Sequence, residues 1–276
     1  MCARSSAAAR ERETSAPPMA AVDAPAPRLL RACIFDLDGT LLNTEECLDT
    51  CIVRAVTALL GAPPTAAQLD SVRGFPDHGE GSWPQRMLAQ LGAAAAAAGV
   101  TPARLFAAAD AHFEELIKQT PKMPGAGEAV AALAAAGVPM ALCTSSMRHH
   151  VALKRQPHEA MFAAVCGGNP GRLAVCVEDV GAEAKPHPRP YLAAAALLGL
   201  PPAQCIAVED SEPGITAAVA AGCFVVATPL PHLRQRAAAL GAHLVLDSLL
   251  EWQARVAPLL AHAGAHAAGA GAAASH

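Results

Sequence analysis

Several features that would point to nucleic acid or a membrane are missing from this 276-residue chain. The formal net charge is −4 and no stretch is strongly basic, so we expect no nucleic-acid partner. No apolar run reaches the ~18 residues that a membrane-spanning helix needs, so we expect no membrane contact. Aromatic residues make up only 3% of the chain while alanine dominates, which fits an alanine-rich proteome as much as any adaptation.

The nine cysteines lack the arrangement of a disulfide framework or a zinc site. They are odd in number and scattered, and no two of them form a Cys-x-x-Cys pair. We therefore predict buried, reduced thiols and a reducing compartment. Cys47 and Cys51 are one helical turn apart, which is more typical of a packed helix face than of a metal site.

The two ends of the chain differ in composition from the rest. Residues 1–27 are rich in Ala, Pro, Arg and Ser, so we predict that they are disordered. The first ten residues resemble a transit peptide in having arginines and no acidic residue, but Glu11 and Glu13 break that pattern. We expect a cytoplasmic protein, with a chloroplast or other organelle address as the alternative. Residues 259–276 form a low-complexity tail.

Between these ends, short apolar runs alternate with helical patterns. The runs are nearly continuous in apolar character, which is typical of parallel strands buried on both faces. The expected strands are Arg31–Phe35, Pro139–Cys143, Gln204–Val208, Cys223–Ala227 and His243–Leu246. Helices are expected at Gly125–Ala136, Pro190–Leu198 and Ile215–Ala221, each followed by a glycine suited to end it. The alternation predicts an α/β fold with a parallel sheet covered on both sides.

One long segment, residues 44–120, has helical signals and no convincing strand. Asn43 can cap the first helix, with Glu46 three residues later. That helix has an apolar face formed by Leu48, Cys51, Ile52, Ala55, Val56, Leu59 and Leu60. Further helices are expected at Ala66–Ser71, Pro84–Leu91 and Pro102–Lys118. We predict a helical cap inserted into a core made of residues 28–43 and 121–258, over the strand ends where such sheets bind ligands.

The end of the first expected strand is the most informative place in the sequence. The strand runs directly into Asp36 and Asp38, which can reach one small volume, and Gly39 permits a tight turn. Two carboxylates this close repel each other unless a cation lies between them or one holds a proton. Mg²⁺, with oxygen ligands, is the natural partner. One carboxylate could then attack phosphorus while the other transfers protons. The alternative is a polar turn after a buried strand.

Three more polar clusters occur at expected strand or helix ends. The hydroxyl and backbone N–H groups of Thr144-Ser145-Ser146 suit a phosphate oxygen, although an ordinary helix cap would have the same sequence. Lys185, just before two prolines, could aim a fixed ammonium, although a surface lysine is the simpler alternative. Glu209 and Asp210 form a second acidic pair that could complete a metal site. The order of these clusters is a stronger indication than any one of them.

The chain resembles the haloacid dehalogenase superfamily, in the branch with a helical cap inserted after the first strand, over residues 30–255. Asp36-Leu37-Asp38-Gly39-Thr40 matches the first motif, Thr144 the second, Lys185 the third and Glu209-Asp210 the fourth. The resemblance implies a Rossmann-like core, Mg²⁺ as cofactor and a phospho-aspartyl intermediate on Asp36.

The resemblance also implies roles for single residues. Asp38 would be the general acid and base. Phosphate would be bound by Thr144, Ser145 and Lys185. The metal would be held by Asp36, Asp38 and Asp210, together with the Leu37 carbonyl, and Glu209 would support these ligands from behind.

The run Cys143–Ser146, followed by Lys154 and His158, is similar to pseudouridine-5′-phosphatase-like members. The implied activity is hydrolysis of a small phosphomonoester, such as a nucleoside, sugar or polyol phosphate, by a monomer. Three departures stand out: Asn43 in place of the usual Asp, a Gly-, Pro- and His-rich cap stretch from Arg73 to Arg86, and a long segment Cys166–Ala184 with its own apolar run.

Two other functions remain open on the sequence. A phosphomutase of the β-phosphoglucomutase type would carry a histidine ten residues after the second Asp, where this chain has Leu48. A non-catalytic binding protein on the same fold would be favoured by loss of a motif residue, and all are present. Substrate choice is expected to lie in the cap, with Arg73, His78 and Arg86 as the polar residues to test.

Overall fold

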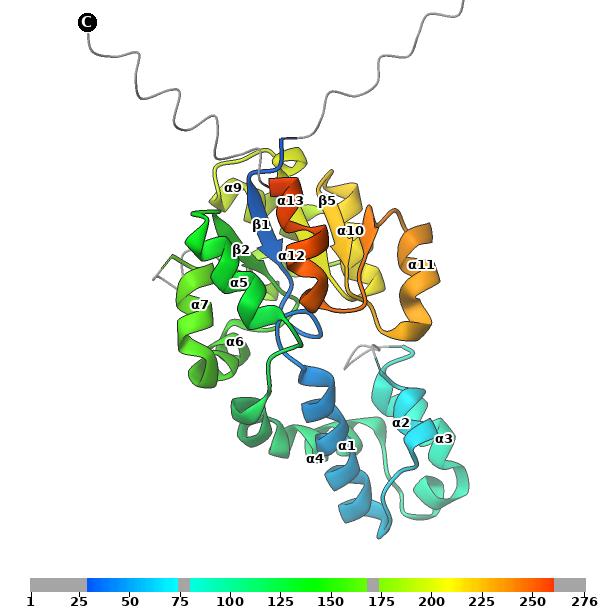
Figure 1. The fold of residues 1–276 in the computed structure, drawn as a ribbon. Helices are drawn as coiled ribbons and strands as arrows, with labels where there is room; N and C mark the ends of the chain where they lie inside the picture. The colour runs from blue at the N-terminus through cyan, green and yellow to red at the C-terminus, as the bar shows by residue number, and fades with distance from the viewer. Residues whose placement is uncertain (1–28, 74–79, 168–173, 261–276) are drawn as a thin grey trace, which may run out of the picture.

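The computed structural model describes residues 29–73, 80–167 and 174–260, which form a core and a cap (Figure 1). The predictions for residues 1–27, for His78 and for nearly all of the C-terminal tail lie outside these described residues. The core contains a six-stranded sheet in the order β3-β2-β1-β4-β5-β6, with every neighbouring pair parallel. The α/β fold predicted from the sequence is therefore confirmed.

Five of the six strands coincide with the expected apolar runs. The strands are β1 (Ala32–Phe35), β2 (Met140–Cys143), β3 (Ala174–Val175), β4 (Cys205–Glu209), β5 (Phe224–Ala227) and β6 (Leu244–Val245). The sequence did not predict β3, which lies in the long segment Cys166–Ala184. The apolar run noted in that segment contains β3, but only the pairing of Ala174–Val175 with β2 identifies it as a strand.

Helices cover both faces of the sheet, as Figure 1 shows. One layer contains α5 (Ala126–Ala135), α6 (Arg148–Arg155), α7 (Glu159–Val165), α12 (Trp252–Arg255) and α13 (Ala257–Leu260). The other contains α9 (Arg189–Leu197), α10 (Glu212–Ala220) and α11 (Arg234–Ala239). Alternate side chains of β1 point to opposite faces of the sheet. Cys33 and Phe35 pack against the first helix layer, and Ala32 and Ile34 pack against the second.

Short elements connect these layers. They are α8 (Val177–Val180) and the 3₁₀ turns η2 (Gln156–His158), η3 (Gly181–Glu183), η4 (Pro202–Gln204), η5 (Pro231–Leu233) and η6 (Leu249–Glu251). Leu260, the last residue of α13, is buried in the core, so the core continues past the expected boundary at residue 258. The eight cysteines in the described residues are all buried and free, as predicted.

The cap is all-helical over the described residues between 44 and 120, as predicted. It contains α1 (Thr44–Leu60), α2 (Ala66–Asp70), α3 (Trp83–Ala97), α4 (Pro102–Leu116) and the 3₁₀ turn η1 (Ile117–Gln119). The expected apolar face of α1 packs into a separate cluster with Trp83, Met87 and Leu105. Two details differ from expectation. α3 continues to Ala97 across a break at Gly92, and Asn43 does not cap α1, because its side-chain amide donates to the Glu46 carboxylate instead (3.1 Å).

Two adjacent linkers join the cap to the core. The Asn43 N–H donates to the Pro121 carbonyl (2.8 Å), and Leu42 forms a bridge with Lys122, so the chain leaves and re-enters the core at one place. β1 points towards the cap in Figure 1, so the carboxyl end of the sheet faces the cap helices. Within the described residues, no single helix could cross a membrane by length and composition; one pair, Trp83–Ala97 with Pro102–Gln119, passes together but is bent by 106°.

Candidate active site

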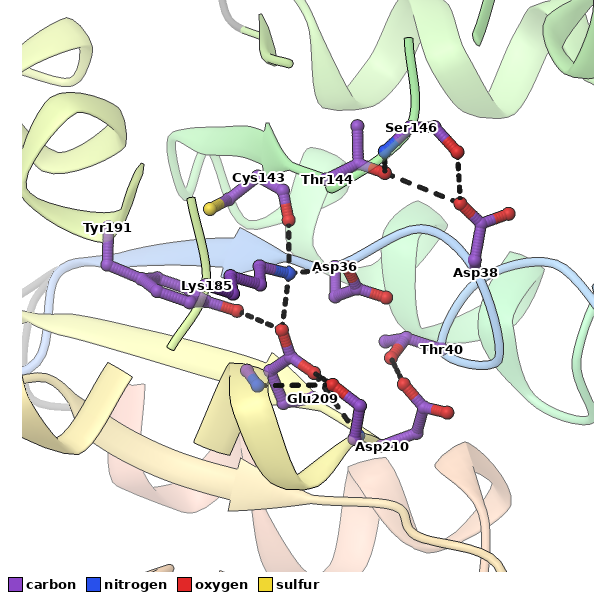
Figure 2. Close-up of polar contacts among 12 residues, drawn as sticks. Asp36, Asp38, Thr40, Cys143, Thr144, Ser146, Lys185, Tyr191, Glu209 and Asp210 are labelled. Carbon is purple, nitrogen blue, oxygen red and sulfur yellow. Dashed lines mark hydrogen bonds and ion pairs between the residues drawn. The ribbon is translucent and has the colours of Figure 1, made fainter. Parts of the chain in front are cut away.

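The register of the central strands brings three of the four sequence motifs to one edge of the sheet. Phe35 lies opposite both Leu142 of β2 and Val208 of β4, so the residues that follow these strands leave the sheet at the same level. Asp36, Thr144 and the acidic pair Glu209-Asp210 therefore lie close together, as Figure 2 shows. The sequence predicted that the motifs meet only from their order along the chain. The structure shows that the alignment of the strands brings these residues together.

Lys185 lies at the centre of the site. Its ammonium donates to the Asp36 carboxylate (2.6 Å) and to the Cys143 carbonyl (2.9 Å), and it forms an ion pair with Glu209. The side chain is only 4% exposed. Burial works to lower the pKa of Lys185, but Asp36 and Glu209 raise it well above its usual value, so the ammonium stays charged. The predicted role of an aimed ammonium fits this position.

Glu209 is completely buried and fully hydrogen-bonded. Besides Lys185, it accepts bonds from the Tyr191 hydroxyl (2.7 Å), the Ser211 hydroxyl (3.0 Å) and the Ser211 N–H (3.3 Å). Gly214 leaves the space that this carboxylate occupies, because a Cβ there would lie 1.9 Å from Glu209 Oε1. With its oxygens satisfied by these donors, Glu209 is suited to support the site from behind. Sequence reasoning missed Tyr191, although it is the only tyrosine in the chain and opens the helix after Lys185.

Asp210 directly follows β4 and is in contact with the turn that follows Asp38. Thr40 donates to Asp210 Oδ1 (3.3 Å), and Gly39 has a φ of +78°. A Cβ on Gly39 would lie 2.1 Å from Asp210 Oδ2, so the close approach of these two segments requires glycine. The first and fourth motifs are thus in direct contact.

The carboxylates of this cluster carry more negative charge than the protein neutralises. One oxygen from each of Asp36, Glu209 and Asp210 lies within 4.8 Å of the others, and Lys185 contacts Asp36 and Glu209. Burial raises the pKa of Asp36 to about 7, with Lys185 opposing the shift and Glu209 and Asp38 adding to it. Burial, and then repulsion from Asp36 and Glu209, raises the pKa of Asp210 well above its usual value. A hard divalent cation would balance this charge, so the residues present fit Mg²⁺.

Asp38 lies apart from that cluster and faces a second buried lysine. Lys154 of α6, with 2% of its side chain exposed, forms an ion pair with Asp38, and the Ser146 hydroxyl donates to Asp38 Oδ2 (2.6 Å). Thr144 approaches the same oxygen more loosely (3.4 Å). Burial works to raise the pKa of Asp38, but Lys154 and the hydrogen bonds from Ser146 and Thr44 bring it below its usual value. The two aspartates of the first motif therefore have opposite electrostatic surroundings.

Several predicted site residues are placed differently from expectation. Ser145 is exposed, and its neighbour Ser146 makes the contact with Asp38. The Leu37 carbonyl already accepts the N–H groups of Leu41 and Leu42 (3.0 Å each), which leaves it poorly suited to hold a metal. The side chain of Asp38 is not part of the carboxylate cluster that the structure assembles, which contains Glu209 instead. Lys154 was noted in the sequence only for the resemblance, and no local signal marked it as a partner of Asp38.

Two of the three predicted cap residues, Arg73 and Arg86, make contacts with other residues of the cap. Arg73 binds the Asp49 carboxylate through Nε (3.2 and 3.3 Å) and Nη2, and its Nη1 donates to Asp70 (2.5 Å). Arg86 donates to the Gly81 carbonyl (2.9 Å). His78 lies outside the described residues. Arg73 and Arg86 therefore shape the cap in this structure, while their contact with a substrate remains a prediction.

The chain is similar to a family of known proteins in sequence and in structure. The haloacid dehalogenase-like hydrolase family matches residues 30–222. Protein CbbY of Rhodobacter capsulatus is 32% identical over 209 residues, covering 74% of this chain and 88% of that protein. A probable pseudouridine-5′-phosphatase of Drosophila melanogaster is 30% identical over 243 residues, covering 82% and 93% respectively. A HAD family hydrolase structure from Deinococcus radiodurans R1, with bound phosphate and sodium, has a TM-score of 0.68 at 28% identity, covering 84% of this chain and 97% of that chain.

Proposed function

This chain belongs to the haloacid dehalogenase-like hydrolase family and is a phosphoric monoester hydrolase, and we propose that it cleaves a small phosphomonoester with Mg²⁺ through a phospho-aspartyl intermediate on Asp36. The observation that supports this most directly is the split between its two aspartates. Asp36 lies buried against Lys185 beside Asp210, while Asp38 lies against Lys154. Two carboxylates in different surroundings can take two different chemical roles.

In the first step, an oxygen of Asp36 attacks the phosphorus atom while the bond to the leaving oxygen breaks. Asp38 gives a proton to that oxygen, and an alcohol departs. Lys185 stays within reach of the transferred group and offsets its negative charge, and Thr144 and Ser145 are the proposed donors to its other oxygens. The ion pair with Lys154 keeps Asp38 ionised, so this step requires that pair to loosen when Asp38 takes up a proton.

In the second step, Asp38 takes a proton from a water molecule, which attacks the phosphorus of the aspartyl phosphate. The bond between phosphorus and Asp36 breaks, and inorganic phosphate leaves. The ionised form of Asp38 that Lys154 favours is the form that this step needs. Mg²⁺ would be held by Asp36 and Asp210, and it would supply the positive charge that lets a phosphate dianion approach a carboxylate.

The alternatives have less support. In the cap, Leu48 is partly buried against the apolar cluster, so the position where a mutase would carry its histidine offers no proton-transfer group. A non-catalytic role would leave unexplained why two buried lysines each pair with one aspartate of the first motif, Lys185 with Asp36 and Lys154 with Asp38. The relative named as a pseudouridine-5′-phosphatase supports a nucleoside, sugar or polyol phosphate as substrate.

The covalent role of Asp36 is tested by replacing it with asparagine, which has nearly the same shape but cannot form the acyl phosphate. We expect Asp36→Asn to lower the rate of p-nitrophenyl phosphate hydrolysis in Mg²⁺ to less than about a hundredth of the wild-type rate. The matched control is Asp110→Asn, the same change on the exposed side of α4, which should keep the wild-type rate. A well-folded Asp36→Asn protein with substantial activity would exclude the phospho-aspartyl route.

A further inference from the structure

A groove lies at the end of the sheet opposite the active site. It is bordered by Arg31 before β1, by Pro139 before β2, by the end of α9 at Leu198, and by α12 and α13, and it encloses about 800 Å³. Figure 1 shows β1 beginning at this end of the sheet, away from the cap. None of the residues used in the proposed mechanism lines the groove, so its role is separate from the chemistry.

The walls of this groove are largely apolar. α5 contributes Leu133, the end of α9 contributes Leu198, and α12 and α13 contribute Trp252 and Leu260. The Trp252 ring also packs against Phe35 of β1, with 5.8 Å between the ring centroids, so the groove adjoins the sheet itself. Walls of this kind favour an occupant with apolar side chains, because its burial would remove apolar surface from water.

Arg31 adds a positive charge at the edge of the groove. It is the one charged residue among the described residues that line it, and it is exposed. Its guanidinium has no ion pair or hydrogen bond with another described residue. An occupant that brings a carboxylate beside its apolar side chains would pair with this guanidinium. The groove therefore selects for a short apolar stretch followed or preceded by an acidic residue.

Both ends of the described chain lie at this groove. The described residues begin at Leu29, two positions before Arg31, and they end at Leu260, which lines the groove itself. Residues 261–276 contain only Ala, Gly, His and Ser, so they offer neither a large apolar side chain nor an acidic one. Residues 17–22 read Pro-Pro-Met-Ala-Ala-Val, and Asp23 follows directly. The N-terminal segment matches the groove, and the C-terminal segment does not.

We propose that residues 17–23 of this chain occupy the groove. Met19 and Val22 lie against its apolar walls, and the Asp23 carboxylate pairs with the Arg31 guanidinium. An extended chain spans roughly 3.3–3.6 Å per residue, so residues 24–30 are long enough to turn back and bring Asp23 to Arg31. The partner of this surface is thus a segment of the same chain, and the inference does not depend on the phosphatase activity.

The test is hydrogen–deuterium exchange of the full-length protein, measured by mass spectrometry of overlapping peptides. We expect the amides of residues 19–24 to exchange at least about 10-fold more slowly than a free chain of that sequence. Residues 3–10 and 262–275 should exchange at the free-chain rate. Val22→Asp, which puts a charge against the apolar wall, should remove the protection of residues 19–24. The matched control is Ala8→Asp, which adds the same charge outside the docking stretch and should preserve it.

A charge exchange tests the ion pair. Asp23→Lys and Arg31→Glu should each reduce the protection of residues 19–24 by about two- to five-fold, as expected for a partly exposed pair, and the double variant should restore it. Both single variants place like charges together, so restoration in the double variant cannot come from damage to the fold. Thermal unfolding of each variant confirms that the core is intact.

Four results would overturn the inference. Free-chain exchange at residues 19–24 of the wild type would show that the segment does not dock. Protection confined to residues 262–275 would assign the groove to the C-terminal segment. Protection that disappears on 100-fold dilution would assign it to a second copy of the chain. A double variant with no more protection than the single variants would exclude the pairing of Asp23 with Arg31.

Discussion

At the scale of single residues, two buried lysines give the two aspartates of the first motif different properties. Lys185 contacts Asp36 but shares its charge with Glu209, and burial still raises the pKa of Asp36 to about 7. Lys154 contacts Asp38 and, despite burial, brings the pKa of Asp38 below its usual value. The protein without metal therefore buries more negative charge around Asp36 than it neutralises, and this has a measurable consequence.

We expect the stability of the magnesium-free protein to fall as pH rises from about 4 to about 7. The pKa of Asp36 is about 7 in the folded protein against an ordinary 3.8, so the folded state binds this proton more tightly than the unfolded state. The stabilisation is thus complete below the unfolded pKa and is lost as pH rises through the folded pKa. Asp210, with its pKa also raised, acts in the same direction. From pH 5 to pH 8, Asp36 alone should lower the free energy of unfolding by about 2–3 kcal/mol.

The measurement is urea unfolding at several pH values in the presence of a chelator. Asp36→Asn should flatten the pH dependence, whereas Asp110→Asn should preserve it. Adding Mg²⁺ at pH 8 should restore stability to the wild type, because a bound cation stabilises the folded state. Stability that rises with pH over this range would show that Asp36 is not buried as the structure has it.

At the scale of elements, the first turn of α10 shows how helix position and active-site geometry depend on each other. Gly214 lies in that turn directly against Glu209, whose oxygens are held by Lys185, Tyr191 and Ser211. A side chain at position 214 would displace either the helix or the carboxylate. The position of the Glu209 carboxylate therefore leaves room only for glycine at position 214 of the helix.

We expect Gly214→Ala to destabilise the protein by about 1–3 kcal/mol and to lower kcat, because the new Cβ would lie 1.9 Å from Glu209 Oε1. Gly127→Ala is the matched control, since it lies in the first turn of α5 and its Cβ would meet only the end of the Lys122 side chain, at 3.1 Å from Nζ. That control should be neutral or stabilising by up to ~1 kcal/mol, because alanine favours helix more than glycine does. Chemical denaturation and steady-state kinetics test both; equal effects of the two changes would contradict the placement of Glu209.

At the scale of the whole molecule, the apolar interior formed by the described residues is divided into three clusters. Two of them lie on opposite faces of the sheet, and the third belongs to the cap alone. The cap and core are joined by the linkers at Asn43 and Pro121, and by contacts such as that between the His158 ring and the Thr120 carbonyl (2.7 Å). Free cysteines occur in all three clusters, so they report on the integrity of each part.

We expect iodoacetamide to leave the eight described cysteines of the native protein unmodified on a timescale that modifies them all in urea. Each of the eight is buried, and burial raises the pKa of Cys166 and of Cys205 to about 11, which keeps little thiolate at neutral pH. Mass spectrometry of the digested protein reads each site separately. Rapid native labelling of Cys33 or Cys143 would contradict the packing of the core, whereas labelling confined to Cys47 and Cys51 would indicate that the cap opens by itself.

The sequence by itself determined the fold class, five of the six strands, the helical cap and the residues of the four motifs. It could do so because these features are local: apolar runs, helix ends, and polar residues that directly follow a strand. Parallel strands with aligned carboxyl ends then bring such residues together in any fold of this class. Asp36 and Asp210 were predictable for this reason, whereas Lys185, which follows no strand, was predicted from the order of the motifs and from the resemblance.

Only the tertiary structure decided which side chain contacts which. Lys154 meets Asp38 from 116 residues away, Tyr191 supports Glu209 from another element, and Ser146 rather than Ser145 turns towards the site. The two-residue strand β3 likewise exists only through its pairing with β2. Such contacts depend on distances between elements far apart in the chain, and a local pattern of residues contains no information about those distances.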